Sequence, residues 1–338
     1  MSLSLFKRRR VNGSEISFDM ASPQSFLVSS ALRYFKARSQ DVDVSAIRSW
    51  VNRLTGLPWP RHAASIQRFI HPNLGGEWIY AAHESSQRVV LYLHGGGYFF
   101  CSPRTYRPVT VGLSRHVGAA TLALGYRLAP EHPYPAALDD ALAGYSWLLE
   151  QGVRPDQIAL AGDSAGGGLA LATLVRLRDQ GIPLPSACIC FSPWTDLAAT
   201  GLSLDSNDSH CAMFSGNAIR KARNHYLGKA DPYHPSISPL YADLQGLPPL
   251  LIHVSDSEVL LDDSTRLAER ARQAGVEVTL KVWSRLPHVW QLFAHLIPEG
   301  KASLQEASKF LRHHLDHGGV ESKKKFQGDR FELPYSIP

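Results

Sequence analysis

Residues 157 to 170 read Gln-Ile-Ala-Leu-Ala-Gly-Asp-Ser-Ala-Gly-Gly-Gly-Leu-Ala. The run begins with apolar residues typical of a buried strand and continues from Ala165 with a helical pattern. Gly162 and Gly166 stand two positions on either side of Ser164, where a tight turn tolerates only small side chains. This G-x-S-x-G arrangement is typical of a nucleophile elbow, which presents a serine hydroxyl at a helix N-terminus. Ser164 is therefore a candidate nucleophile, although a glycine-rich turn that only packs closely or holds a phosphate has the same pattern.

A second glycine motif lies upstream. His94-Gly95-Gly96-Gly97 directly follows the apolar run Arg88 to Leu93, which reads RVVLYL and predicts a strand buried on both faces. An HGGG-type loop in this place supplies backbone N–H groups to an oxyanion hole. One such donor contributes roughly 3 to 4 kcal/mol to catalysis. Two motifs in the correct order, each after its own strand, favour a catalytic site over two unrelated turns.

Strands and helices alternate on both sides of the elbow. Alternation of this kind predicts an α/β fold with a mostly parallel central sheet and helices on both faces. The expected strands are 66–82, 87–93, 121–126, 157–162, 187–192, 249–254 and 276–283, and the expected helices are 135–151, 165–179 and 264–274.

The segments outside this alternation predict the domain organisation. Residues 1–65 read as an N-terminal helical cap segment, with helical stretches at 22–40 and 44–56. Residues 66–317 form the expected catalytic domain, in which the polar stretch at about 197–240 is expected to be an insertion that helps to cover the site. The polar residues 318–338 read as a tail outside the core.

Composition excludes several classes of function. The formal net charge is +5, but the Lys and Arg residues are spread along the chain, so we expect no nucleic-acid partner. The four cysteines lack metal-ligand spacing and are expected to be buried free thiols, and we expect neither a metal nor an organic cofactor. No apolar signal region or 18-residue apolar run is present, which predicts a cytoplasmic protein without membrane insertion.

Residues 85 to 315 resemble the hormone-sensitive-lipase-like esterases, the bacterial family IV or GDXG group of the α/β-hydrolase superfamily. The resemblance is carried by the motifs HGGGYFF, YRLAPEHPYPAALDD, GDSAGGGLA, SPWTDL and LPHVW. It implies an α/β-hydrolase fold with a helical cap, in which His288 of LPHVW is the general base. The resemblance also implies that the amides of Gly95, Gly96 and Ala165 form the oxyanion hole. His94 and Asp163 would then support the surrounding loops.

The acid of the triad has two candidates. The family pattern D-x-L-x-D fits Glu258 to Asp262, with glutamate in the acid position, 30 residues before His288. Asp256 lies two positions earlier and is the competitor, because a carboxylate at the end of a strand could also reach the imidazole. Asp262 and Asp263 begin a helix and are interpreted as its N-terminal capping groups.

The resulting functional hypothesis is a serine carboxylester hydrolase for a small-molecule ester. The resemblance implies short- to medium-chain acyl groups and makes a homodimer plausible. An amidase or a lactonase could use the same triad, and a small-molecule receptor on this scaffold is a further alternative, which the presence of His288 disfavours. The candidate pocket residues are all apolar and are Tyr98, Phe99, Phe100, Trp194, Met213 and Phe214.

Overall fold

The structure is a computed structural model, and it describes residues 8–11, 14–17, 21–38, 43–55, 64–72, 74–81 and 87–317. Its centre is one sheet with the strand order β1-β2-β10-β9-β8-β7-β5-β6-β4-β3. The strands are β1 (Arg8–Val11), β2 (Ser14–Ser17), β3 (Ser65–His71), β4 (Leu74–Tyr80), β5 (Val89–Leu93), β6 (Ala120–Gly125), β7 (Ile158–Asp163), β8 (Ala187–Phe191), β9 (Leu250–Ser255) and β10 (Val278–Trp283).

The middle of the sheet is parallel. Strands β10, β9, β8, β7, β5 and β6 pair in parallel, whereas β4 is antiparallel to β6 and β3 is antiparallel to β4. The chain passes from β5 to β6 on one side and then to β7 on the other side of β5. In open α/β sheets, ligands bind outside the carboxyl ends of the strands at such a reversal.

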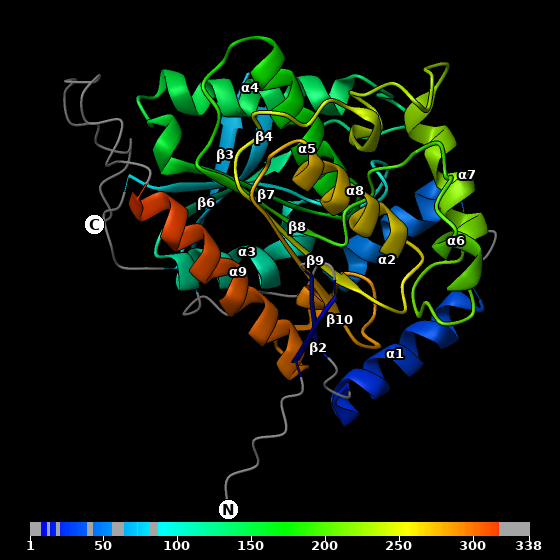
Figure 1. Ribbon diagram of the computed structural model, residues 1–338. Coiled ribbons are helices and arrows are strands. Elements are labelled where there is room, and N and C mark those ends of the chain that lie inside the picture. The colour runs from blue at the N-terminus through cyan, green and yellow to red at the C-terminus, as the bar shows by residue number, and fades with distance from the viewer. Residues whose placement is uncertain are drawn as a thin grey trace, which may run out of the picture.

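Helices cover both faces of the sheet, as Figure 1 shows. Helices α3 and α9 lie together on one face, and α4, α5 and α8 lie on the other. The helices are α1 (Pro23–Lys36), α2 (Val44–Leu54), α3 (Arg107–Val117), α4 (Ala136–Glu150), α5 (Ser164–Asp179), α6 (Ser203–Ser206), α7 (Gly216–Leu227), α8 (Leu261–Gln273) and α9 (Pro298–His317). Short 3₁₀ turns are η2 (Pro103–Tyr106), η3 (Pro155–Gln157), η4 (Pro239–Tyr241) and η5 (Trp290–Phe293). The predicted fold class is confirmed.

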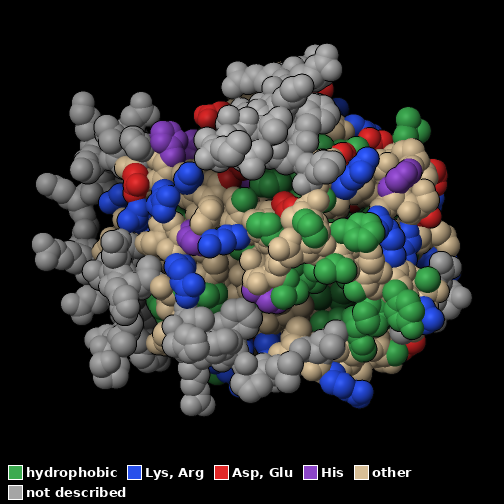
Figure 2. All heavy atoms as spheres, turned by 90° about the horizontal axis from the view of Figure 1, so that it is seen from below, with side chains coloured by type: hydrophobic (Ala, Val, Ile, Leu, Met, Phe, Trp, Pro, Cys, Tyr) green, Lys and Arg blue, Asp and Glu red, His purple; other side chains and the backbone are tan. Residues whose placement is uncertain are grey.

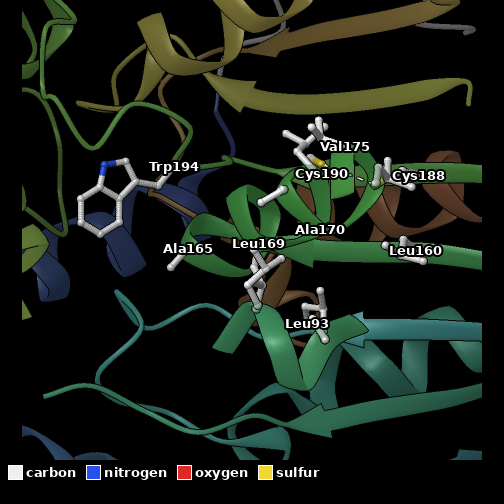
Figure 3. Packing of buried hydrophobic residues seen from close by; sticks show 14 of the residues in the cluster. Leu93, Leu160, Ala165, Leu169, Ala170, Val175, Cys188, Cys190 and Trp194 are labelled. Carbon is white, nitrogen blue, oxygen red and sulfur yellow. Dashed lines mark hydrogen bonds between the residues drawn. The ribbon is translucent and has the colours of Figure 1, made fainter. Parts of the chain in front are cut away.

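The core explains why the central strands read as continuous apolar runs. Every residue of β5, β7, β8 and β9 is buried, because helices cover them on both faces. Figure 3 shows Leu160 of β7 together with Cys188 and Cys190 of β8 among the buried side chains around α5. The two sulfur atoms lie 3.8 Å apart on one face of β8, and all four cysteines are free thiols, three of them buried.

The N-terminal segment contributes to the sheet as well as to its surroundings. Helices α1 and α2 lie beside α6 and α7 in Figure 1, at one end of the molecule. Strands β1 and β2 were not expected, and β2 pairs in parallel with β10, so residues 1–65 are not wholly helical. The predicted boundaries of the cap stay a prediction, and the tail at 318–338 lies outside the described residues.

Candidate active site

Ser164 stands at the turn from β7 to α5. Its backbone has φ +51°, a conformation that costs energy for a non-glycine residue and is typical of a strained nucleophile elbow. A Cβ on Gly162 would lie 2.3 Å from the carbonyl oxygen of Gly166, and one on Gly166 would lie 2.0 Å from that of Leu93. Both positions therefore require glycine for the turn to close.

His288 and Glu258 form a buried pair next to this edge of the sheet. His288 Nδ1 lies 2.5 Å from Glu258 Oε2. The other carboxylate oxygen, Oε1, accepts hydrogen bonds from Ser192 Oγ at 2.8 Å and from the Ser255 amide at 2.7 Å. Both carboxylate oxygens of Glu258 thus have hydrogen-bond partners, which fix its orientation toward the imidazole.

The competing carboxylate, Asp256, binds a different partner. Its two oxygens accept hydrogen bonds from Ser284 Oγ at 3.0 Å and from the Arg285 amide at 2.7 Å. Asp256 therefore holds the turn that precedes His288, and the geometry favours Glu258 as the residue that orients the imidazole.

The pairing determines which nitrogen of His288 can act as a base. An ionised carboxylate only accepts hydrogen bonds, so Nδ1 carries the proton of the neutral ring and Nε2 keeps its lone pair. Nε2 is buried and has no hydrogen-bond partner among the described residues. The Phe214 ring stands edge-on to the imidazole, with 5.4 Å between centroids.

Ser192 connects the histidine to the nucleophile side of the site. Its hydroxyl contacts Glu258 and lies 3.5 Å from the amide nitrogen of Val289, the residue after His288. Two residues farther along the chain, the amide of Trp194 donates to the Ser164 carbonyl at 2.8 Å. The ends of β7, β8 and β9 and the loop after β10 thus meet at one edge.

One amide of the glycine loop already has an acceptor. The amide of Gly95 donates to Asp163 Oδ1 at 2.9 Å, and its role as an oxyanion donor stays a prediction. Gly96 and Gly97 have φ +107° and +59°. Among the described residues, the amides of Gly96, Gly97 and Ala165 have no acceptor. These three N–H groups remain available to a ligand.

Comparisons with known proteins agree with this geometry. A family model for the alpha/beta hydrolase fold matches residues 90–292. A solved esterase from the bacterial hormone-sensitive lipase family is 43% identical, with a TM-score of 0.83 over 88% of this chain and 100% of its own. This chain belongs to the hormone-sensitive-lipase-like esterases of the α/β-hydrolase fold.

Other relatives of this esterase carry related names. An acetyl-hydrolase of Streptomyces hygroscopicus is 46% identical over 70% of this chain and 79% of its own length. An esterase of Acinetobacter venetianus is 40% identical over 68% of this chain and 76% of its own length. The solved esterase EstE5, from a crystal soaked with p-nitrophenyl butyrate, is 40% identical with a TM-score of 0.83 over 88% of this chain and 100% of its own.

His94 braces the glycine loop of the esterase from within the core. Its Nδ1 donates to the Gly95 carbonyl at 2.7 Å, and its ring stacks on Tyr126 with 4.4 Å between centroids. Tyr126 in turn donates its hydroxyl to the His94 carbonyl at 2.6 Å. Burial lowers the pKa of His94 to about 4, so the ring is neutral near pH 7.

Asp163 joins the elbow to the glycine loop. Its Oδ1 accepts from the Gly95 amide and from Tyr92 Oη at 2.7 Å. Burial raises the pKa of Asp163 to about 6, and hydrogen bonds from the hydroxyls of Tyr106 and Tyr92 oppose that rise. The carboxyl group therefore fixes the spacing between the two motifs that carry Ser164 and Gly96.

The candidate pocket residues occupy different environments. Phe214 contacts the imidazole, and the neighbouring Met213 is half-buried. Tyr98 is buried and stacks on Tyr226 with 3.7 Å between centroids, and Trp194 is buried beside it. Phe99 packs against Phe100 and against His225 of α7. Among these described residues, the Phe214 ring contacts His288 and the Trp194 amide contacts Ser164, whereas Tyr98 and Phe99 belong to the glycine loop.

Sequence reasoning missed the polar contacts made between distant segments. Asp263 does not cap its own helix as expected, because its Oδ2 accepts from the amides of Thr195 and Asp196 at 2.7 and 2.8 Å. Asp262 likewise accepts from the amide of Ser203 at 3.0 Å. The motif SPWTDL contained a signal for the Asp263 contacts, because its backbone amides directly follow a buried strand and need hydrogen-bond acceptors.

Arg48 of α2 is a second contact that the sequence did not reveal. Its Nε donates to the Phe99 carbonyl at 2.7 Å, and one terminal nitrogen donates to the Ala129 carbonyl at 2.6 Å. Both terminal nitrogens also bind the Glu131 carboxylate, at 2.7 and 2.8 Å. Because the amides of Phe99 and Phe100 bond the Gly96 carbonyl, Arg48 holds the turn that contains Gly96.

Proposed function

We propose that this esterase is a serine carboxylester hydrolase that acts through a Ser164–His288–Glu258 triad and a covalent acyl-enzyme. The observation that carries the proposal is the buried His288–Glu258 pair, whose free Nε2 lies at the same sheet edge as the strained Ser164 elbow. A nucleophile, a base and a carboxylate that orients the base are the parts that this chemistry requires.

The reaction proceeds in two steps. His288 Nε2 takes the proton of Ser164 Oγ as that oxygen attacks the ester carbonyl, and the positive charge on the imidazolium is balanced by Glu258. The imidazolium then returns the proton to the leaving alcohol. Water, deprotonated by the same nitrogen, attacks the acyl-enzyme, and the imidazolium returns this proton to Ser164 Oγ as the acid leaves.

Three backbone N–H groups are proposed to stabilise the negative charge of the tetrahedral intermediate. The unoccupied amides of Gly96, Gly97 and Ala165 border the elbow, and the N-terminus of α5 adds its positive dipole end. Because Asp163 already binds the Gly95 amide, this assignment replaces Gly95 by Gly97.

Short to medium acyl chains are the proposed substrates. Support comes from relatives: one is named an acetyl-hydrolase, and EstE5 was soaked with p-nitrophenyl butyrate. The Phe214 ring beside His288 gives the site an apolar wall that suits an acyl or alkyl group.

The test is hydrolysis of p-nitrophenyl esters from acetate to palmitate by wild type and Ser164→Ala. We expect activity to peak at short chains and to fall about 10⁴-fold or more in the variant. A matched set of amides and lactones measured in parallel distinguishes the esterase from an amidase or lactonase. Equal activity in wild type and variant would remove Ser164 from the mechanism.

A further inference from the structure

Helix α1 is oriented with its polar residues inward. Ser25 and Ser29 are 0% and 3% exposed, whereas Phe26 and Leu27 are 66% and 69% exposed. A surface helix of a globular protein ordinarily buries its apolar stripe and exposes its polar one. The first turn of α1 is held by polar contacts, since Ser22 Oγ and Ser25 Oγ both donate to Glu299 Oε2, at 3.0 and 2.7 Å.

The apolar outer face continues along α1 and onto α2. Tyr34, Phe35 and Trp50 are also exposed, and the rings of Phe35 and Trp50 lie 5.7 Å apart. We call the set Phe26, Leu27, Tyr34, Phe35 and Trp50 the outer face. Figure 2 shows hydrophobic side chains gathered on the side of the molecule on which α1 lies in Figure 1. Exposed apolar side chains gathered in this way mark a site of interaction.

The charges on α1 itself are of one sign. Residues 21–38 contain Arg33, Lys36 and Arg38 and no acidic residue. Arg33 and Lys36 donate to backbone carbonyls at 208, 210 and 211, which carry no net charge to cancel theirs. The Arg38 guanidinium lies 3.6 Å from the centre of the Tyr34 ring. Three acids near α1 have other partners. Asp43 caps α2, Glu299 binds the inward serines, and Asp208 accepts a hydrogen bond from the Gly216 amide.

We propose that the outer face docks on an anionic phospholipid surface, with α1 lying in the plane of the headgroups. Exposed aromatic and leucine side chains enter the acyl boundary, and the surrounding cations bind the acidic headgroups. A second copy of the chain would bring like charges together on this face, which disfavours a homodimer there. At 14 residues α1 is shorter than a helix that spans a bilayer, and no described helix is long and apolar enough to do so.

The helix that carries most of the outer face contacts a loop that leads to the proposed active site. Lys36 Nζ donates to the Cys211 carbonyl at 3.1 Å, and Phe214, three residues later, contacts His288. An enzyme held by α1 therefore keeps the loop from 208 to 214 close to the lipid surface. This inference concerns binding and does not depend on the proposed function.

The test is flotation of the full-length protein with vesicles of phosphatidylcholine alone and with one fifth phosphatidylglycerol. Wild type is expected to float with the anionic vesicles at low salt and to be released at about 0.5 M salt. Phe26→Ser/Leu27→Ser is expected to lower the partition coefficient about tenfold or more, and Arg38→Gln about fivefold. Ile70→Ser is the matched control, because Ile70 is 74% exposed on β3, away from α1, and is expected to bind as wild type does.

The following results would overturn the proposal. If wild type does not float with anionic vesicles, or if the double variant floats equally well, the outer face is not a lipid-docking surface. Light scattering on the same samples detects a dimer that Phe26→Ser/Leu27→Ser dissociates, and that result would assign the outer face to a second copy. Circular dichroism of each variant checks that loss of binding is not loss of folding.

Discussion

The carboxyl edge of the sheet and the N-terminal helices are attached to the molecule in opposite ways. At the sheet edge, Glu258 and Asp163 are buried, and their partners come from neighbouring strands and from the loops that directly follow them. Helix α2, by contrast, reaches the glycine loop through the long side chain of one arginine, Arg48. The difference teaches that contacts within the sheet and its loops position the proposed catalytic groups, whereas the N-terminal helices contact the loops around them.

The largest effect is expected from the carboxylate pair. Glu258→Gln is expected to lower kcat about 10³- to 10⁴-fold, because an amide cannot balance the imidazolium and favours the wrong tautomer of His288. Asp256→Asn, two positions away, is expected to change kcat less than about threefold, because it removes charge only from hydrogen bonds to Ser284 and Arg285. Steady-state kinetics on one ester measure both, and a reversed order would make Asp256 the acid.

The next effect is expected in the glycine loop. Gly96→Ala is expected to lower kcat about 100-fold, because its φ is +107° and a Cβ would lie 2.2 Å from the Phe100 carbonyl oxygen. Gly75→Ala is the control, since a Cβ there meets nothing within 4 Å. Unchanged kcat in Gly96→Ala would show that the loop does not supply the oxyanion donors.

A smaller effect is expected where the two regions meet. Arg48→Met is expected to lower kcat about tenfold with little change in KM, because the turn that carries Gly96 loses its anchor on α2. Arg53→Met, on the same helix, is the matched control. Similar kinetics in the two variants would mean that α2 does not position the loop.

The smallest effect concerns stability. Burial, and then the neighbouring Asp196, raises the pKa of Asp263 from an ordinary 3.8 to about 8. Between these values the folded state binds more protons than the unfolded state, so the free energy of unfolding falls as pH rises through this window. Between about pH 7 and pH 8, the free energy of unfolding of Asp263→Asn is expected to fall by about 1 kcal/mol less than that of wild type. Denaturant titrations at the two pH values measure the difference, with Asp262→Asn as control.

The strands that could be predicted from the sequence are those whose apolar pattern matches their burial in the fold. The apolar runs that became β5, β7, β8 and β9 are buried on both faces, so their composition alone marks them. The motifs around Ser164 and His288 likewise depend on neighbours in the chain. Helix α3 and strands β1 and β2 were missed, and β2 pairs with a strand more than 260 residues later.

The polar contacts of the site were less accessible to prediction. The Gly95 amide is occupied by Asp163, 68 residues away, and Asp263 serves the loop at Thr195 instead of its own helix. Each of these contacts depends on which side chains the tertiary fold brings together. No local pattern distinguishes Gly95 from Gly96, because only the fold determines which amide faces a carboxylate.

The tie between the first helix and the last has a consequence for the timing of synthesis. Ser22 and Glu299 are 277 residues apart, and both the amide and the hydroxyl of Ser22 bind that carboxylate. Chains grow from the N-terminus, so α1 leaves the ribosome long before its anchor exists. Throughout that interval the amide and hydroxyl of Ser22 lack this acceptor, so the docking of α1 on α9 is among the last contacts that the growing chain can complete.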